Sequence, residues 1–158
     1  MKTLLIAIIG ATIAQVPLSY VTVSMESLFL GQWFVDLNNQ MIIYFVSVAI
    51  VSIAIIVSLG MPAYFALKHK KWNNIINVMV VGALIPVVII LGLEFAAGYD
   101  SGFSSGENFY GHYRTIIESG KRTYWGWIKI LEQFFVFGIH GCLGAYVFHK
   151  LYTRGSDA

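Results

Sequence analysis

Four long apolar stretches, separated by polar connections, dominate the pattern of hydrophobic and polar positions along the chain. They run over residues 4–24, 41–67, 75–97 and 127–149. A helix of about 20 mostly apolar residues crosses the hydrocarbon core of a bilayer, because helix formation pairs the backbone polar groups that lipid would leave unsatisfied. The pattern therefore predicts an all-α fold, an integral membrane four-helix transmembrane bundle that occupies residues 1–158 as a single domain.

The start of the chain has a competing interpretation. Met1 and Lys2, followed by an apolar run to Ala14, resemble a secretory signal peptide. The apolar run continues to Val23, however, which is longer than the apolar part of such a peptide. We therefore interpret this stretch as the first membrane-spanning helix.

The basic residues predict the orientation of the bundle, since Lys and Arg near the ends of spans are retained on the cytoplasmic side. This rule is followed most closely by short connections, and the short connection between the second and third stretches is rich in lysine. Both termini are thus predicted to be cytoplasmic, in a multi-pass protein of the bacterial inner membrane. The predicted cytoplasmic residues are Lys2, Lys68, Lys70, Lys71, Lys150 and Arg154, and the predicted outer ones are Arg114, Lys121 and Arg122.

The tryptophans support the same four segments. Amphipathic rings prefer the headgroup level of a bilayer, and no tryptophan falls in the middle of a predicted span. These residues are Trp33, Trp72, Trp125 and Trp127.

All three prolines, Pro17, Pro62 and Pro86, fall inside predicted helices. Each frees a backbone carbonyl and bends its helix unless neighbouring groups compensate. The expected kinks are either ordinary features of membrane helices or the mark of a hinge or cavity.

The outer connection, residues 98–122, is long for an otherwise compact chain. Loops longer than about 12–15 residues are usually functional or disordered, and the aromatic residues in this one argue against disorder. We expect a loop with a short surface helix between Asn108 and Glu118. Within it, Phe109, Tyr110 and Tyr113 are candidate contacts for a partner.

Polar residues gather toward the outer ends of the third and fourth spans. Glu94 lies on the third, and Lys129, Glu132 and Gln133 lie on the fourth. Lys129 and Glu132 share a helical face, where they can pair, and Glu94 joins them if the two helices are neighbours. Ionisable groups at membrane level are costly and functional by default. The cluster is either a salt bridge between helices, a cation-attracting vestibule or a docking site for a partner helix.

The fourth span is the predicted packing helix. Small residues let helix backbones approach closely, and the pairs Gly138/Cys142 and Gly141/Ala145 have the required four-residue spacing, with Gly144 in the same stretch. The contact lies either within one chain or between copies of a homo-oligomer.

Gln15 in the first span and His140 in the fourth are isolated polar residues. We expect Gln15 to make an interhelical hydrogen bond, worth about 0.6 kcal/mol on average, and His140 to be a packed, hydrogen-bonded residue. A bis-histidine haem site would need a second histidine at the same depth on a facing helix, which no other span supplies.

Composition and missing motifs narrow the function. A net charge of +2 does not favour nucleic acid as a partner, and the single cysteine excludes an intrachain disulfide or a CxxC pair. The chain contains no HExxH or GxSxG motif, no phosphate loop and no dinucleotide fingerprint. We therefore predict that the protein is not an enzyme and has no cofactor or metal site.

Two functional hypotheses rank above a third, an intramembrane enzyme, for which the candidate groups are too few. The first is a non-enzymatic protein that acts in the lipid bilayer by recognising another protein, of the accessory, immunity, phage-exclusion or defence type, with the outer loop as its recognition surface. The alternative is a small homo-oligomeric channel or transporter for an ion or small molecule, motivated by the outer polar cluster and by Gln15, Pro17 and Pro86. Several copies would be needed, since four helices are too few to enclose a wide pore.

Overall fold

The computed structural model describes residues 2–29 and 39–156 of the protein. In chain order the elements are α1 (Lys2–Phe29), α2 (Asn39–Ile55), the π-helical turn η1 (Ile56–Gly60), α3 (Met61–His69), α4 (Ile75–Ala96), β1 (Ser105–Phe109), β2 (His112–Glu118), β3 (Lys121–Arg122) and α5 (Tyr124–Ser156).

The described chain has four helical segments that are long and apolar enough to cross a membrane. Their bounds are Lys2–Met25, Gln40–His69, Ile75–Ala96 and Tyr124–Gly155. The prediction of four spans is therefore confirmed, although the first and last helices extend beyond their predicted ends. Trp33, used above as an interface marker, lies outside the described residues.

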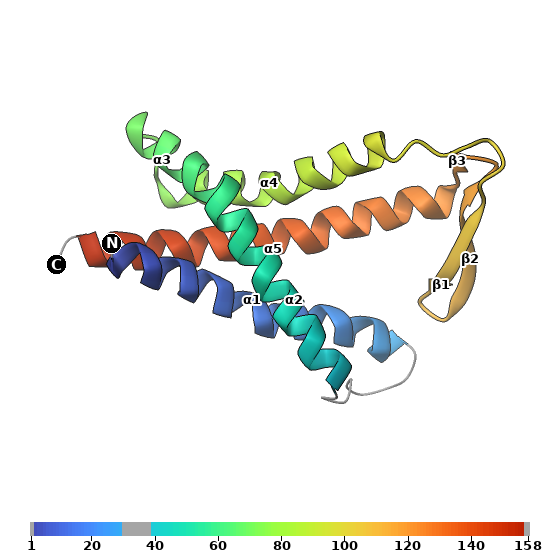
Figure 1. Ribbon diagram of the computed structural model, residues 1–158, viewed down its shortest axis with the longest axis horizontal. Helices are drawn as coiled ribbons and strands as arrows, with labels where there is room; N and C mark the ends of the chain where they lie inside the picture. Colours follow the sequence, from blue (N-terminus) through green and yellow to red (C-terminus); the bar gives the residue numbers. More distant parts are fainter. Residues whose placement is uncertain (1, 30–38, 157–158) are drawn as a thin grey trace.

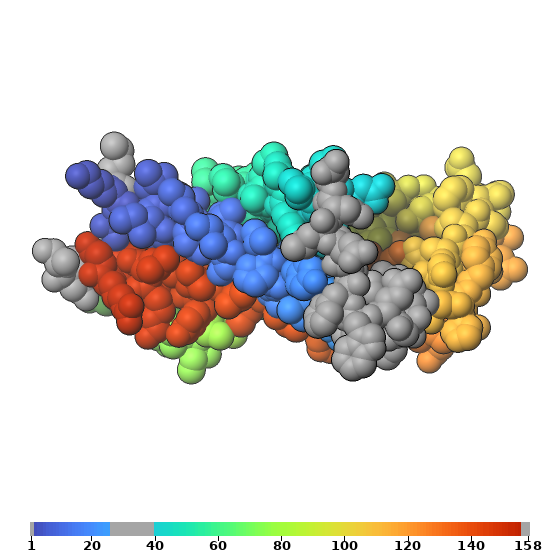
Figure 2. Space-filling view, turned by 90° about the horizontal axis from the view of Figure 1, so that it is seen from below, coloured from blue at the N-terminus to red at the C-terminus, as the bar shows by residue number. Residues whose placement is uncertain are grey.

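Helix α5 is the centre of the bundle, with α4 packed along one side and α1 along the other (Figure 1). α2 crosses these helices obliquely (Figure 1). α1 begins and α5 ends at the same end of the bundle, where the Thr3 hydroxyl donates to the Gly155 carbonyl at 3.2 Å. The strands lie at the opposite end, coloured yellow to orange in Figure 2.

The second span is one continuous helix with a widened turn in its middle. In η1 the Met61 N–H bonds to the Ile56 carbonyl, five residues back. Pro62 follows at once and has no N–H to give to the preceding turn, so the extra residue in η1 takes up the mismatch. α1 and α4, in contrast, continue through Pro17 and Pro86 without a break.

A tight reversal joins α3 to α4. Lys71 adopts the left-handed conformation, with φ 59°, and the Trp72 N–H bonds to the Leu67 carbonyl at 2.9 Å. This is the Schellman arrangement, which satisfies carbonyls at the end of α3. Asn74 then caps α4 by accepting from the Asn77 N–H at 2.8 Å.

Helices α4 and α5 approach so closely that their backbones touch. A Cβ atom added at Gly82 would lie 2.6 Å from the Gly141 carbonyl oxygen and would collide with the Ala145 side chain. Pro86, one turn further along α4, contacts the same site at Gly141. Because Gly141 and Ala145 pack against a helix of the same chain, this small-residue pair serves contact within one molecule.

The connection over residues 98–122 contains three β-strands, so the fold is not all-α and the predicted surface helix between Asn108 and Glu118 is wrong. β1, β2 and β3 form an antiparallel sheet in that order, with Asn108 opposite Tyr113 and Glu118 opposite Lys121. Both two-residue turns have positive φ at each position, 49° and 84° at Tyr110–Gly111 and 47° and 75° at Ser119–Gly120. Such turns match the twist of a hairpin and require this backbone conformation.

The sheet is attached to the beginning of α5. Ile116 and Ile117 of β2 are buried, and so is Ile130 of α5. Gly126 allows this contact, since a Cβ atom there would collide with the Ile116 carbonyl oxygen. Thr123 adds a polar link: its hydroxyl donates to the Thr115 carbonyl and accepts from the Gly126 N–H at 3.2 Å, which caps the helix.

Candidate functional site

Two hollows in the described structure contain polar groups at different depths. The first, which we call the sheet pocket, has a volume of about 300 Å³ and lies between the strands and the ends of α4 and α5. Its polar lining consists of Glu94, Tyr99, Ser105, Glu107, Arg122, Lys129 and Gln133. The second, which we call the helix cavity, has a volume of about 380 Å³ and lies among the spans.

The charges of the sheet pocket are arranged in pairs. Arg122 forms an ion pair with Glu94, and Lys129 forms one with Glu107. Arg122 also donates to the Tyr99 hydroxyl at 3.0 Å. Burial lowers the pKa of the Arg122 guanidinium from its ordinary value, but a guanidinium is still protonated near neutral pH. Because each acid here faces a base, the pocket does not have the net negative charge of a cation-attracting vestibule.

The sequence placed Glu94, Lys129, Glu132 and Gln133 in one cluster, and the structure divides them between different partners. The pairing of Lys129 with Glu132 expected from their spacing is replaced, since Lys129 binds Glu107 of β1 and Glu132 accepts a hydrogen bond from the Tyr110 hydroxyl. Gln133, which is uncharged, lines the sheet pocket. The β1–β2 hairpin packs against α5 and supplies Glu107 and Tyr110 as partners, which a prediction without strands could not include.

The three aromatic residues predicted as partner contacts differ in exposure. Tyr113 is 74 % exposed, whereas Phe109 and Tyr110 are half-buried. Phe109 packs edge-on against Tyr110 at 4.7 Å between ring centroids and tilts against Trp125 at 5.9 Å. Phe109 and Tyr110 therefore shape the sheet, and Tyr113 is the one that faces outward.

One arginine of β2 and two rings at the start of α5 lie at this end of the molecule. The Arg114 guanidinium lies 4.3 Å from the centroid of the Trp125 ring, which is a cation–π contact. Tyr124, at the start of α5, is 73 % exposed. Arg114 follows Tyr113 in β2 and therefore points to the opposite side of the sheet, toward α5. We call the two exposed residues, Tyr113 and Tyr124, the aromatic face.

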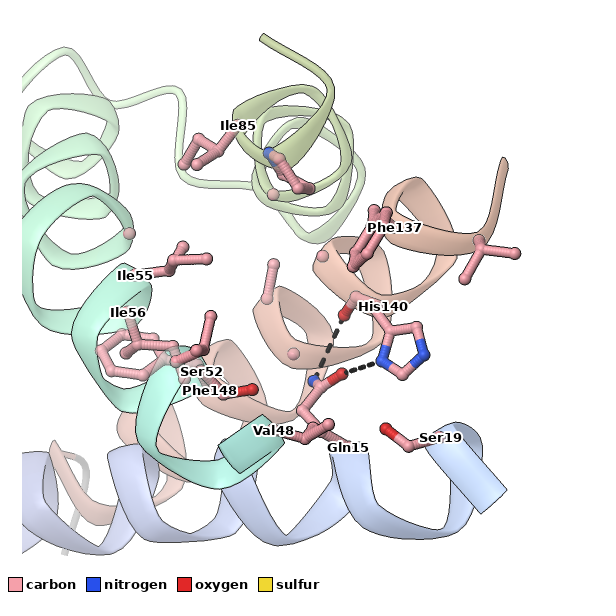
Figure 3. Close-up of a pocket in the computed structure, with 18 of the residues that line it drawn as sticks. Gln15, Ser19, Val48, Ser52, Ile55, Ile56, Ile85, Phe137, His140 and Phe148 are labelled. Atoms are coloured by element: carbon pink, nitrogen blue, oxygen red, sulfur yellow. Dashed lines mark hydrogen bonds between the residues drawn. The ribbon is translucent and has the colours of Figure 1, made fainter. Parts of the chain in front are cut away.

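The helix cavity lies among α1, α2, α4 and α5 (Figure 3). Its walls are mostly aliphatic, with Val48, Ile55, Ile56 and Ile85 among them. Polar groups from α1 and α5 enter it on one side, through Gln15, Ser19 and His140. No Lys, Arg, Asp or Glu of the described chain lines it.

Gln15 and His140 hold α1 and α5 together across this cavity, which confirms both expectations for these residues. The Gln15 amide nitrogen donates to the His140 carbonyl at 3.2 Å and to the Ala11 carbonyl at 3.3 Å. Gln15 Oε1 lies 2.7 Å from His140 Nδ1, a contact that Figure 3 draws as a dashed line. Gly144 makes room for the amide, since a Cβ atom there would lie 2.8 Å from Gln15 Nε2.

These contacts fix the proton position on His140. Two carbonyl acceptors require the NH₂ group of Gln15 on their side, so Oε1 is the atom that faces the imidazole and must accept. His140 Nδ1 therefore carries a hydrogen, and in the neutral ring Nε2 is the acceptor.

Ser19 is the polar residue of this region that sequence reasoning missed. It is only 1 % exposed and lies one helical turn from Gln15, on the same face of α1. Its hydroxyl has no hydrogen-bond partner in the described part of the chain. The spacing of Gln15, Ser19 and Thr22 along one helical face was the available signal.

The remaining small residues of α5 differ in their surroundings. Gly138 faces α4 near Val87 and the Ala83 carbonyl, at about the limit of contact. Cys142 is a half-buried free thiol. In residues 2–29 and 39–156, no group of three His, Cys, Asp or Glu side chains is placed to hold a metal ion.

Comparison of the chain with protein-family models, with characterised proteins and with solved structures gives no match. We therefore infer the function from the geometry of the sheet and of the helix cavity.

Proposed function

We propose that this chain is a non-catalytic, multi-pass protein of a bacterial inner membrane that recognises another protein through the aromatic face of its sheet. Accessory, immunity and defence proteins act in this way. The observation that carries the proposal is a sheet that is firmly attached to α5 through Ile116 and Ile117, with the exposed ring of Tyr113 on β2 and the exposed ring of Tyr124 where α5 begins.

Attachment matters because a pre-ordered surface loses less conformational entropy when a partner binds. The sheet has three kinds of attachment to α5, namely the buried Ile116 and Ile117, the Thr123 cap and the polar contacts to Lys129 and Glu132. The residues that looked like a recognition cluster in the sequence thus act as anchors in this proposal.

The exposed groups are the kinds that dominate binding energy at protein interfaces. Tyr, Trp and Arg are enriched among interface residues with large effects. Tyr113 and Tyr124 are both more than 70 % exposed. A tyrosine belt at the headgroup level is the competing explanation, because such rings also favour that level.

The basic residues support an orientation with the sheet outside. Lysines and arginines at the opposite end of the bundle outnumber those at the sheet end, where Arg122 and Lys129 are also neutralised by ion pairs. The proposed topology has both termini in the cytoplasm.

A channel is less well supported by this geometry. The two hollows lie along one face of α5, the sheet pocket at Gln133 and the helix cavity from Val136 and Phe137 onward. No Lys, Arg, Asp or Glu of the described chain lines the helix cavity, and the charges in the sheet pocket are paired.

The decisive experiment is photo-crosslinking in living cells with p-benzoylphenylalanine in place of Tyr113. We expect a discrete protein adduct, because the probe would lie at the centre of the contact. Tyr124→Ala in the same chain should reduce the adduct several-fold, since an interface tyrosine commonly contributes more than about 1 kcal/mol.

Phe95 is the matched control position, because it is 83 % exposed but lies on α4 away from the aromatic face. The probe at Phe95 should give no protein adduct. If both positions crosslink only to lipid, the aromatic face is an interfacial belt and the recognition proposal is wrong.

A further inference from the structure

We infer that the helix cavity binds an uncharged, lipid-soluble molecule with a long apolar body and a single hydroxyl or carbonyl group. This site is separate from the aromatic face and lies at membrane depth. Its volume of about 380 Å³ is within the range of about 300–1,000 Å³ that small-molecule sites occupy.

The lining excludes a charged ligand group. No Lys, Arg, Asp or Glu side chain of the described chain lines the cavity, and the Nδ1 hydrogen of His140 is already donated to Gln15. A phosphate, carboxylate or ammonium buried there would therefore have no counter-charge. Burial of an unpaired charge at this depth is costly. The ligand must therefore be neutral where it enters the protein.

The polar groups provide a place for one hydrogen-bonding group. The Ser19 hydroxyl is buried and unpartnered within the described residues, although a buried hydroxyl normally finds a partner. Thr22, one turn away, behaves differently, since its hydroxyl bonds to the Leu18 carbonyl at 2.9 Å. A ligand carbonyl or hydroxyl beside Ser19 would supply the missing bond, because a serine hydroxyl both donates and accepts.

The shape of the bundle keeps the apolar part of the site open. α2 packs along α1, and within the described chain it forms no extended contact with α4 or α5. Further along the same span, Tyr64 packs against Phe148 at 5.2 Å and rejoins α5. The second span is thus held near its ends and bridges the cavity between them, with η1 at the cavity wall, and π-helical turns are frequent at functional sites.

The test uses the full-length protein in bilayer nanodiscs and a long-chain primary alcohol that carries a diazirine in its chain. Illumination should attach the probe to cavity residues such as Val48, Ser52 and Ile85, as mapped by mass spectrometry. The labelling should be saturable and should fall when the same alcohol without the diazirine is added.

Two matched pairs of variants locate the site. Ser19→Ala should weaken labelling about fivefold, as expected for one neutral hydrogen bond, whereas Ser47→Ala should not, because the Ser47 hydroxyl already bonds to the Ile43 carbonyl at 2.9 Å. Val48→Phe should block the cavity. Val46→Phe should leave labelling unchanged, because Val46 is 53 % exposed and does not line the cavity.

Chemically matched probes separate the possible occupants. The corresponding fatty acid, which carries a carboxylate, should label the cavity at least tenfold less than the alcohol. Equal labelling by acid and alcohol, or equal labelling of the Ser19→Ala and Ser47→Ala variants, would overturn the inference. Retention of a phospholipid acyl chain that the alcohol does not displace would overturn it too, and so would a crosslink at Val48 to a second copy of the chain.

Discussion

The second and third spans are almost equally apolar and yet pack in opposite ways. Their mean hydropathy is 2.8 for Gln40–His69 and 2.7 for Ile75–Ala96. Helix α4 of the third span touches α5 backbone to backbone at Gly82 and Gly141. Helix α2 of the second span packs along α1 and stands away from α5, with the helix cavity beneath it.

The difference shows what holds helices together in lipid. Lipid tails are as apolar as leucine, so apolar surface alone gives no drive for one helix to prefer another. Close packing and interhelical hydrogen bonds supply the preference, and α4 and α1 have these contacts to α5 at Gly141 and His140. Hydropathy therefore predicts that a helix spans the membrane, whereas small and polar residues decide which neighbour it binds.

The largest effect is expected where the backbones touch. In Gly141→Leu, the new Cβ would lie 3.0 Å from the Pro86 ring and would collide with the Gly82 carbonyl, so α4 would be pushed away from α5. We expect the free energy of unfolding in an SDS titration to fall by about 3 kcal/mol. Gly92→Leu is the control, because a Cβ atom there has nothing within 4 Å. Similar losses in both variants would show that the close contact contributes little.

Removal of the Gln15–His140 contact should have the next largest effect. Gln15→Leu and His140→Phe should each lower the free energy of unfolding by about 1–2 kcal/mol, and the double variant should cost less than their sum. A double-mutant cycle in the same titration measures this coupling. Thr12→Val is the control, since the Thr12 hydroxyl bonds only to Ile8 of its own helix at 2.9 Å. Strict additivity would mean that the two residues act independently.

The loss of one ion pair between the sheet and α5 should have a weaker effect. Glu107→Gln removes an ion pair whose side chains are 29 % and 36 % exposed, which corresponds to about 0.5 kcal/mol. Amide hydrogen exchange in β1 and β2 should become about twofold faster, while exchange in α4 stays unchanged. Glu118→Gln serves as control, because Glu118 is exposed and forms no ion pair within the described chain. If the control speeds exchange equally, the effect comes from net charge and not from the pair.

The smallest effect is expected on the outer side of α2. Ile50 is 63 % exposed and faces away from the cavity lining, so Ile50→Ala should change the free energy of unfolding by less than about 0.5 kcal/mol. Val78→Ala on α4, where the side chain is 4 % exposed, should cost more. An equal cost at both positions would contradict the loose packing of α2.

The four spans were predictable because the ability to cross a membrane depends on the composition of each segment separately. Length and hydropathy need no knowledge of neighbours, and the structure confirms all four segments. The Gln15 and His140 hydrogen bonds were predictable for a related reason, since a lone polar side chain among apolar ones must find a partner. The helix cavity beside α2 had no such local signal in the sequence.

The sheet was missed because its turns use unusual residues. Asn-Gly and Asp-Gly are the strong hairpin signals, whereas this chain has Tyr110–Gly111 and Ser119–Gly120. The β-branched and aromatic residues of β2 were consistent with a strand, but a chain dominated by membrane helices favoured a helical interpretation. Once the hairpin was missed, Glu107 and Tyr110 were not available as partners for Lys129 and Glu132, and the predicted ion pairing followed from that error.

Helix α5 has 33 residues, a length of about 50 Å, well beyond the roughly 30 Å of a hydrocarbon core. Thr123 fastens one end to the sheet, and Gly155 at the other end accepts a bond from Thr3. The two attachments are therefore joined by one unbroken helix that is longer than a hydrocarbon core is thick. The sheet and the first residues of the chain, at opposite ends of the molecule, are in this way connected through a single helix.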